Sequence, residues 1–177
     1  MTLKDIVGKY SGNVITGTDK GNAHSYIEFY DLLLGSYVGK GVTLLELGVA
    51  SGKSLLMWEE FLVNGKIFGI DISGCPKCLE GHPLVTFRRA DLSKRESISN
   101  AFPGQTFDII IDDASHQPEY QALAAALLLP RLNPGGTYVI EDVSCGQERF
   151  NGLGISWRID LRHIKNRPDD VMVVFRK

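Results

Sequence analysis

The sequence has few cysteines, no long apolar run and no excess of charge of one sign. Three cysteines in 177 residues are too few for a disulfide framework, so we expect a reduced, cytoplasmic protein. The longest apolar run, Ala122–Leu129, is far shorter than the roughly 20 residues of a membrane span, and the first residues contain no signal core. With a net charge of −2, the chain also lacks the basic character of most nucleic-acid-binding proteins. We therefore expect neither a membrane nor a nucleic acid as partner.

The composition is that of an ordinary globular domain, with 44% hydrophobic and 23% charged residues. A chain of this length buries roughly 70% of the surface that its unfolded form exposes, so it needs no disulfide or structural metal to fold. Because a domain usually takes about 100–200 residues, we expect one compact domain and no large separate substrate domain.

Short apolar runs alternate with helix-like stretches along most of the chain. The helix-like stretches are Gly52–Val63, Ser93–Ala101 and Pro118–Leu132; Ser93 and Glu96 have the spacing of a capping box. The runs are rich in β-branched and aromatic residues and predict strands at Val42–Leu47, Lys66–Asp71, Leu84–Arg88, Phe107–Asp112, Thr137–Glu141 and Val171–Phe175. This alternation predicts an α/β fold with a doubly wound, mostly parallel sheet and right-handed crossovers.

The two ends of the chain depart from the alternation. Residues 1–41 carry no strong strand, and the spacing of apolar residues in Asn22–Ser36 predicts a helix, so we expect an N-terminal helical cap before a domain at 42–177. Near the other end, Ile155–Ile164 and Val171–Phe175 are separated by a turn-rich segment without a helix. We expect an antiparallel hairpin there, at the edge of a seven-stranded sheet.

The strongest local signal is a glycine turn between a strand and a helix, in Leu44–Ser54. Such a turn suits a ligand because glycine lets the backbone approach closely and the helix N-terminus offers free N–H groups. A P-loop would need glycine where Leu47 stands, although Asp108–Asp113 resembles a Walker B strand. A dinucleotide loop would need glycines in place of Ala50 and Lys53. The turn thus fits neither pattern.

A third pattern, the S-adenosylmethionine loop of class I methyltransferases, resembles this turn in its spacing of Glu46, Gly48 and Gly52. Asp71 ends the next strand, nineteen residues after Gly52, where a carboxylate can accept both ribose hydroxyls. Asp91 ends the third strand, where methyltransferases of this class often place an acidic residue near the adenine amino group, and Leu132–Gly136 resembles a turn that recurs in these enzymes. The further residues that we expect around the cofactor are Lys20, His24, Ser51, Ile72, Leu92 and Asp112.

Acidic residues end the fourth and fifth expected strands. Asp112 and Asp113 stand at the first of these ends, Glu141 and Asp142 at the second, and His116 follows closely. Neighbouring strand ends meet at one edge of a doubly wound sheet, and side chains alternate along a strand, so we expect about three of the four carboxylates in one pocket. Close carboxylates repel unless they are protonated or bridged by a cation, and hard oxygen ligands suit Mg²⁺, Mn²⁺ or Ca²⁺ rather than zinc. Alternatively, some of them cap a helix or are solvated.

Several motifs together resemble the macrolide-sugar O-methyltransferases of the macrocin and mycinamicin type. They are Thr18–Gly21, His24, Tyr26, Tyr30, Leu44–Gly52, Ser54, Leu55, Trp58, Gly69–Ile72, Asp112–His116 and Val139–Val143. The resemblance implies S-adenosylmethionine and a divalent metal, typically Mg²⁺, with Asp113, Glu141 and Asp142 as ligands and His116 as general base. It also implies O-methyl transfer as the reaction type but does not carry over the family's substrate; we expect a small hydroxylated acceptor, such as a sugar or polyketide-like molecule. Ala114 departs from the family's usual glycine, and the chain lacks room for the segments that build the sugar pocket.

Other interpretations stay open. The chain could be a P-loop-like kinase or NTPase, or a noncatalytic S-adenosylmethionine-binding module, and a homo-oligomer could supply pocket walls. Asp19, Lys20, His24 and Tyr26 form either a lid over the cofactor or part of a packing helix. Trp58 is expected in the core. Cys75 and Cys78 form a CxxC that would need further ligands, such as His82 and Cys145, to bind zinc. A mild basic excess from Trp157 onward is expected to be a solvated hairpin.

Overall fold

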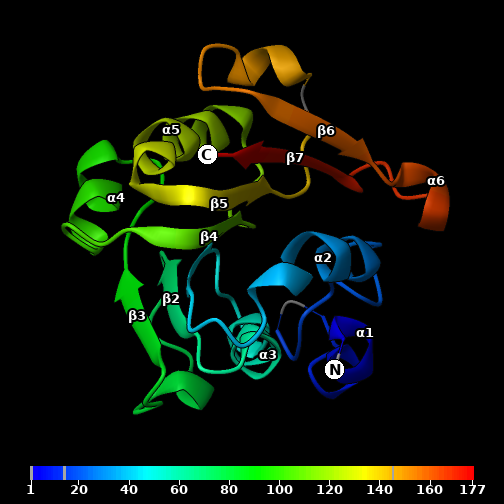
Figure 1. Ribbon diagram of the computed structural model, residues 1–177, viewed down its shortest axis with the longest axis vertical. Coiled ribbons are helices and arrows are strands. Elements are labelled where there is room, and N and C mark those ends of the chain that lie inside the picture. The colour runs from blue at the N-terminus through cyan, green and yellow to red at the C-terminus, as the bar shows by residue number, and fades with distance from the viewer. Residues whose placement is uncertain (1, 14, 145) are drawn as a thin grey trace.

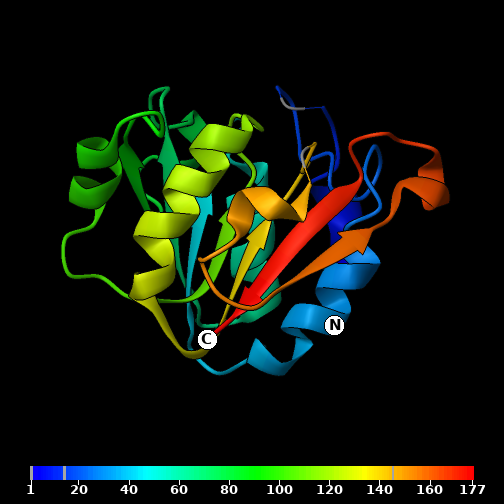
Figure 2. The ribbon, with the colours of Figure 1, turned by 90° about the horizontal axis from the view of Figure 1, so that it is seen from above.

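The computed structural model describes residues 2–13, 15–144 and 146–177, and in them seven strands form one sheet in the order β3-β2-β1-β4-β5-β7-β6 (Figure 1). Strands β1 to β5 pair in parallel, whereas β7 is antiparallel to both of its neighbours (Figure 2). The doubly wound fold with a C-terminal antiparallel hairpin is thereby confirmed. The strands are β1 Thr43–Leu47, β2 Lys66–Asp71, β3 Val85–Arg89, β4 Phe107–Asp112, β5 Leu132–Ile140, β6 Ser156–Asp160 and β7 Val171–Arg176.

Helices cover both faces of the sheet (Figure 1). One face packs against the N-terminal helices and α3, and the other packs against α4 and α5. None of the helices in the described part of the chain is long and apolar enough to cross a bilayer. The α-helices are α1 Leu3–Ile6, α2 Ile27–Leu34, α3 Lys53–Leu62, α4 Arg95–Ala101, α5 Pro118–Leu128 and α6 Arg162–Lys165.

The central strands are buried on both faces, which explains why their sequences are continuous apolar runs. Leu44 packs into the core beneath α2 and α3, whereas its neighbour Leu45 packs into the core beneath α4 and α5. The same alternation separates Ile109 from Ile110 in β4. Successive side chains of a strand point to opposite faces, so a strand between two helical layers needs apolar residues at every position.

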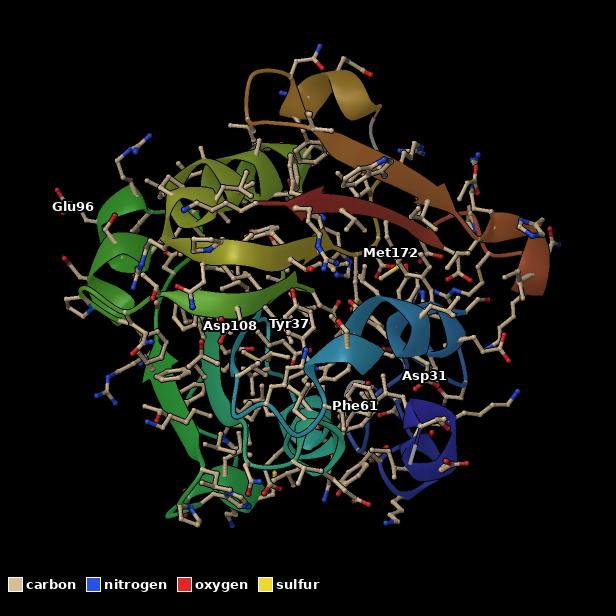
Figure 3. All side chains as sticks on the ribbon, in the orientation of Figure 1. Asp31, Tyr37, Phe61, Glu96, Asp108 and Met172 are labelled. Atoms are coloured by element: carbon tan, nitrogen blue, oxygen red, sulfur yellow. The ribbon has the colours of Figure 1, made fainter. Side chains whose placement is uncertain are left out.

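The N-terminal segment folds differently from the single helix expected at Asn22–Ser36. The helix α2 spans only Ile27–Leu34, and a separate short helix, α1, packs against it. Asp31 on α2 points toward α1 (Figure 3), where its carboxylate accepts hydrogen bonds from the backbone N–H groups of Leu3, at 2.6 Å, and Lys4, at 3.3 Å. This carboxylate satisfies first-turn donors that a helix leaves unpaired. The domain boundary after residue 41 stays a prediction.

Several element boundaries differ from the expected ones. Strand β6 ends at Asp160, and the four-residue helix α6 separates it from β7, where no helix was expected. Strand β5 begins at Leu132, which pairs with Phe107, so the proline–glycine segment lies within the strand, where the register shifts. The capping box at Ser93 does not form, because α4 begins at Arg95 and the Ser93 hydroxyl donates instead to Asp91 at 2.6 Å. Helix α5 ends at Leu128 and continues as a 3-10 turn.

Candidate functional site

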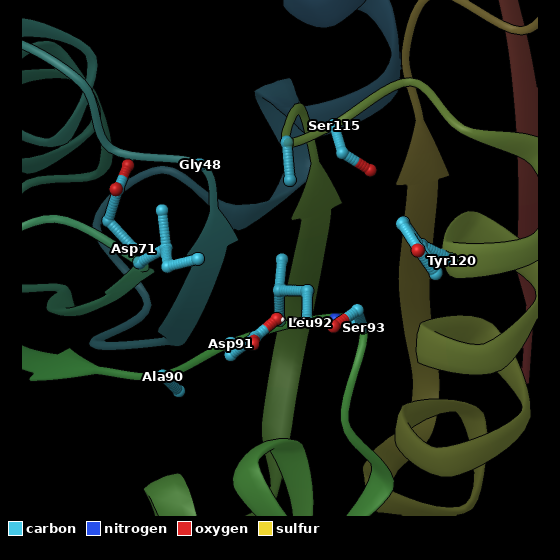
Figure 4. Close-up of a pocket in the computed structure, with 10 residues that line it drawn as sticks. Gly48, Asp71, Ala90, Asp91, Leu92, Ser93, Ser115 and Tyr120 are labelled. Atoms are coloured by element: carbon cyan, nitrogen blue, oxygen red, sulfur yellow. Dashed lines mark hydrogen bonds between the residues drawn. The ribbon is translucent and has the colours of Figure 1, made fainter.

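A pocket of about 480 Å³ lies at the carboxyl ends of the parallel strands (Figure 4). The turn after β1 contributes Gly48, the end of β2 contributes Asp71, and Tyr120 comes from α5. The remaining walls are segments that follow β2, β3 and β4. They comprise Ile72, Ala90, Asp91, Leu92, Ser93, Ala114 and Ser115. Ligands of doubly wound sheets bind beyond the carboxyl ends of the strands, so this pocket has the position of a ligand site.

Asp71 connects the end of β2 to the glycine turn. One carboxylate oxygen accepts hydrogen bonds from the N–H groups of Val49, at 2.8 Å, and Ala50, at 3.0 Å, and the other accepts from the N–H of Ser73 at 2.8 Å. Partial burial raises the pKa of Asp71, but these N–H donors outweigh burial and hold the pKa below its ordinary value. Asp71 is therefore an ionised acceptor at neutral pH.

A second, more acidic pocket of about 270 Å³ adjoins the first, and we call it the acidic pocket. The two pockets share Gly48, Asp71 and Ala114 as walls. The acidic pocket is further lined by Asp113 and His116, which follow β4, and by Asp142, which follows β5. Segment 17–19 of the N-terminal region completes its wall.

Asp113, His116 and Asp142 lie close enough together to hold one cation. Each offers one ligand atom, and these atoms lie within 4.8 Å of one another. Nε2 of His116 is 3.2 Å from Oδ1 of Asp113 and 3.5 Å from Oδ2 of Asp142. The hydrogen bond to Asp113 is the main cause that raises the pKa of His116 above its usual value. Two carboxylates beside a half-exposed imidazole match the oxygen-rich donors that Mg²⁺ takes, so these residues fit a divalent ion.

The backbone is strained at this pocket. Ala50, His116 and Asp142 all have positive φ angles, of 46°, 55° and 52°. A residue with a Cβ adopts this left-handed region at a cost of about 1–2 kcal/mol, and such residues concentrate at functional sites. The strain turns the side chains of His116 and Asp142 toward the same space, which regular strand geometry would not do.

Beneath the acidic pocket lies a buried lysine. The side chain of Lys20 is 1% exposed, and its Nζ lies 2.9 Å from Oε1 of Glu141, 3.4 Å from Glu46 and within hydrogen-bond distance of Asp113. The hydroxyl of Tyr30 also donates to Glu141, at 2.5 Å. Burial alone would lower the pKa of Lys20, but the charges of Asp113, Glu141 and Glu46 outweigh it and raise the pKa well above its usual value. Lys20 is therefore a permanent internal cation.

A second inner contact network supports Asp142. Nδ1 of His24 lies 2.7 Å from Oδ1 of Asp170 and 3.4 Å from Oδ1 of Asp142, and the hydroxyl of Tyr26 donates to the same Asp142 oxygen. The rings of His24 and Tyr26 are stacked, with centroids 4.9 Å apart. Asp170 is not among the site residues that the sequence predicts. Its position was nevertheless readable, because the start of an antiparallel strand lies at the same edge as the carboxyl ends of parallel strands.

The structure divides the expected cofactor-binding residues into two groups. Gly48, Asp71, Ile72, Asp91 and Leu92 line the larger pocket. The side chains of Glu46, Lys20, His24 and Asp112 are instead buried in the interior, where they contact other groups of the protein. The assignment of these residues to the cofactor stays a prediction.

Glu46 and Asp112 illustrate this interior role. Glu46 accepts hydrogen bonds from the Ser54 hydroxyl at 2.6 Å and from Nε1 of Trp58 at 3.3 Å, and Trp58 is in the core, as predicted. Burial, followed by the charge of Asp113, raises the pKa of Asp112 to about 7.

The two other expected residues of the glycine turn have backbone and packing roles. The hydroxyl of Ser51 donates to the carbonyl of Gly17 at 2.8 Å and so attaches the N-terminal region to the turn. Gly52 has a φ of 81°, and a Cβ there would lie 3.0 Å from Leu79, so glycine starts α3 at this position for steric reasons. Both residues shape the turn.

The CxxC pair does not form a metal cluster in the described part of the chain. Cys75 is exposed, and Cys78 is partly buried with its thiol 3.2 Å from the carbonyl of Ser51. In the described residues, two groups are able to hold a metal: one is Asp113, His116 and Asp142, and the other is His24, Asp169 and Asp170. His82 is in neither group, and Cys145 lies outside the described residues.

The chain is similar to proteins of known function and to a known domain family. A family model described as a methyltransferase domain matches residues 45–143. The 8-demethyl-8-alpha-L-rhamnosyl tetracenomycin-C 2'-O-methyltransferase of Streptomyces olivaceus is 33% identical over 149 residues, which cover 79% of this chain and 39% of that protein. The mycinamicin VI 2''-O-methyltransferase of Micromonospora griseorubida is 34% identical over 131 residues, covering 70% of this chain and 32% of that protein.

The fold is also similar to that of a solved methyltransferase structure. The MycE methyltransferase from the mycinamycin biosynthetic pathway, in complex with Mg, SAH and mycinamycin VI, is similar with a TM-score of 0.68 and 30% sequence identity. The similarity covers 80% of this chain and 39% of that one. The chain thus spans about two-fifths or less of the length of these proteins.

Proposed function

The chain belongs to this methyltransferase domain family, and on that premise we propose that it transfers a methyl group from S-adenosylmethionine to a hydroxyl group of a small sugar or polyketide-like acceptor. The relatives named above are O-methyltransferases of glycosylated natural products, and the similar structure holds Mg and SAH. Because the chain spans only part of their length, the activity and the acceptor class are both part of the proposal.

The observation that carries the proposal is that the two pockets share walls. A methyl donor and an ionised hydroxyl must meet in line, and positioning supplies much of the rate of such a transfer. The larger pocket suits the adenosyl group: Asp71 would accept the ribose hydroxyls, and Asp91 and Leu92 would face the adenine. Gly48 and Ala114, common to both pockets, would then border the methyl group.

The acidic pocket would hold Mg²⁺ through Asp113 and Asp142, with Glu141 as the third ligand that the family resemblance implies. Glu141 lies directly behind them, with its carboxylate turned to Lys20 and Tyr30. When bound, such an ion lowers the pKa of an acceptor hydroxyl and orients it. Asp113 and Asp142 would also fix where the acceptor enters, since both line the pocket wall.

His116 would act as the general base. In its neutral form, Nε2 can accept the proton of the acceptor hydroxyl. The imidazolium that forms would keep this proton on Nε2 and donate a hydrogen bond to Oδ1 of Asp113, 3.2 Å away, and the carboxylate of Asp142 would stabilise its charge. Its half-exposed ring can release the proton to solvent afterwards.

Calorimetric titration tests the proposal directly. We expect S-adenosylhomocysteine, the product form of the donor, to bind the purified chain, and ATP with Mg²⁺ not to bind, because Leu47 stands where a P-loop requires glycine. Binding of ATP without S-adenosylhomocysteine would replace the proposal with the nucleotide alternative. Binding of S-adenosylhomocysteine to an Asp71→Asn variant with unchanged affinity would contradict the placement of the ribose.

A further inference from the structure

Lys20 carries a positive charge into the middle of the acidic residues without reaching solvent. Its Nζ is 2.9 Å from each oxygen of Glu141 and 3.4 Å from Glu46. Lysine is almost never fully buried unless it is paired, and here it has three carboxylate partners. The burial of Lys20 is therefore not explained by the neutralisation of a single buried carboxylate.

The contacts of Lys20 divide the carboxylates into an inner and an outer set. Glu46 and Glu141 are turned inward, with side chains at most 2% exposed. Asp142 faces the acidic pocket, and Asp113 belongs to both sets: its Oδ2 contacts Lys20, while its Oδ1 faces His116 at 3.2 Å. Any cation in the acidic pocket would thus share Asp113 with the ammonium group.

We propose that Lys20 is a positioning residue that sets the divalent-cation affinity of the acidic pocket. The ammonium group takes one oxygen of Asp113 and both oxygens of Glu141, and its charge repels a second cation. At the same time it holds Asp113 so that Oδ1 faces His116. The inference rests on the proposed function, since it concerns the ion that methyl transfer would use.

Replacing Lys20 by methionine separates this role from a purely structural one. A structural defect would weaken metal binding, whereas release of Asp113 and Glu141 from the ammonium group strengthens it. We expect Lys20→Met to bind Mn²⁺, titrated calorimetrically into the purified chain, about tenfold more tightly than the unchanged protein. Lys4→Met is the matched control, because it removes the same charge from a side chain that is 71% exposed, and we expect it to leave the affinity unchanged.

Folded Lys20→Met protein that binds Mn²⁺ equally or more weakly would overturn the inference, as would the absence of binding in both proteins. If circular dichroism shows that this variant does not fold, Lys20→Met combined with Glu46→Gln removes one charge of each sign. That double variant must still bind more tightly than Glu46→Gln alone. Binding by Lys20→Met alone, with none by the unchanged chain, would support the role of Lys20. A failure of the proposed function is distinguished by a separate measurement: the unchanged chain would then not bind S-adenosylhomocysteine.

Discussion

Gly48 faces the backbone carbonyl of Asp113 so closely that a Cβ built on Gly48 would lie 2.1 Å from that oxygen. The turn after β1 and the end of β4 are thus packed backbone to backbone. This contact is what brings the larger pocket and the acidic pocket together, since Gly48 lines both and Asp113 lines the second. An alanine at this position could fit only if one of the two segments moved.

Gly48→Ala should therefore lower the free energy of unfolding through two effects: backbone strain at a positive φ, and a steric clash between the new Cβ and the backbone of Asp113. Gly39 supplies the control, because it also has a positive φ, of 74°, but has open space around it. We expect Gly39→Ala to lower the free energy of unfolding by about 1 kcal/mol and Gly48→Ala by about 1–3 kcal/mol more. Urea unfolding of both variants measures the difference. Equal losses would mean that the contact with Asp113 is not tight.

His116→Ala should separate catalysis from cofactor binding. We expect turnover to fall about 10²-fold or more, the usual effect of removing a general base, because Nε2 no longer accepts the hydroxyl proton. The dissociation constant of S-adenosylhomocysteine should stay unchanged, since His116 does not line the larger pocket. His163→Ala, an exposed histidine on α6, controls for the loss of an imidazole. Turnover close to that of the unchanged chain would rule out the base assignment.

Replacing Asp142 should remove the response to metal. We expect Asp142→Asn to weaken Mn²⁺ binding about 10-fold or more, because one of the two carboxylates in the group Asp113, His116 and Asp142 becomes neutral and the remaining donors attract the ion less. Asp160→Asn, which removes an equal charge at the exposed end of β6, should have no such effect. If EDTA leaves the turnover of the unchanged chain intact, the metal assignment is wrong regardless of the variants.

The pKa of Asp71 predicts a pH dependence of stability. Because its folded-state pKa lies below the ordinary value of 3.8, the ionised carboxylate stabilises the folded protein above that value, and the stabilisation is lost as the pH falls through the folded-state pKa. The difference in melting temperature between the unchanged chain and Asp71→Asn should therefore be largest near neutral pH and shrink below about pH 4. A difference that grows on acidification would contradict the hydrogen-bonding role.

Most of the sheet was predictable from sequence because its central strands are buried on both faces. The spans Lys66–Asp71 and Phe107–Asp112 were predicted as observed, since apolar runs bounded by turns leave little freedom. The start of β5 was not predictable in the same way, because its first residue joins the sheet through a pairing with Phe107 that only the tertiary structure supplies. Local turn signals at residues 133–136 pointed to a loop instead.

In the candidate site, strand ends were easier to predict than side-chain directions. The carboxylates at the ends of β4 and β5 could be placed at one edge from topology alone. The family resemblance placed Lys20 near the cofactor, but nothing in the sequence around it predicts that it is buried, because its burial depends on three carboxylates distant in the chain. The positive φ angles of His116 and Asp142, which aim their side chains, likewise have no sequence signature such as glycine.

The order of the last two strands has a consequence for the support of the acidic pocket. Strand β7 lies between β5 and β6, although it follows β6 in the chain, so β6 is joined to the sheet through β7. Asp170, directly before β7, then reaches His24, and Lys165 of α6 donates to the His24 carbonyl at 2.6 Å. The support that His24 gives Asp142 therefore depends on the segment between β6 and β7. Although it contributes no residue to the acidic pocket, that segment braces one of the pocket's two strand-end carboxylates from behind.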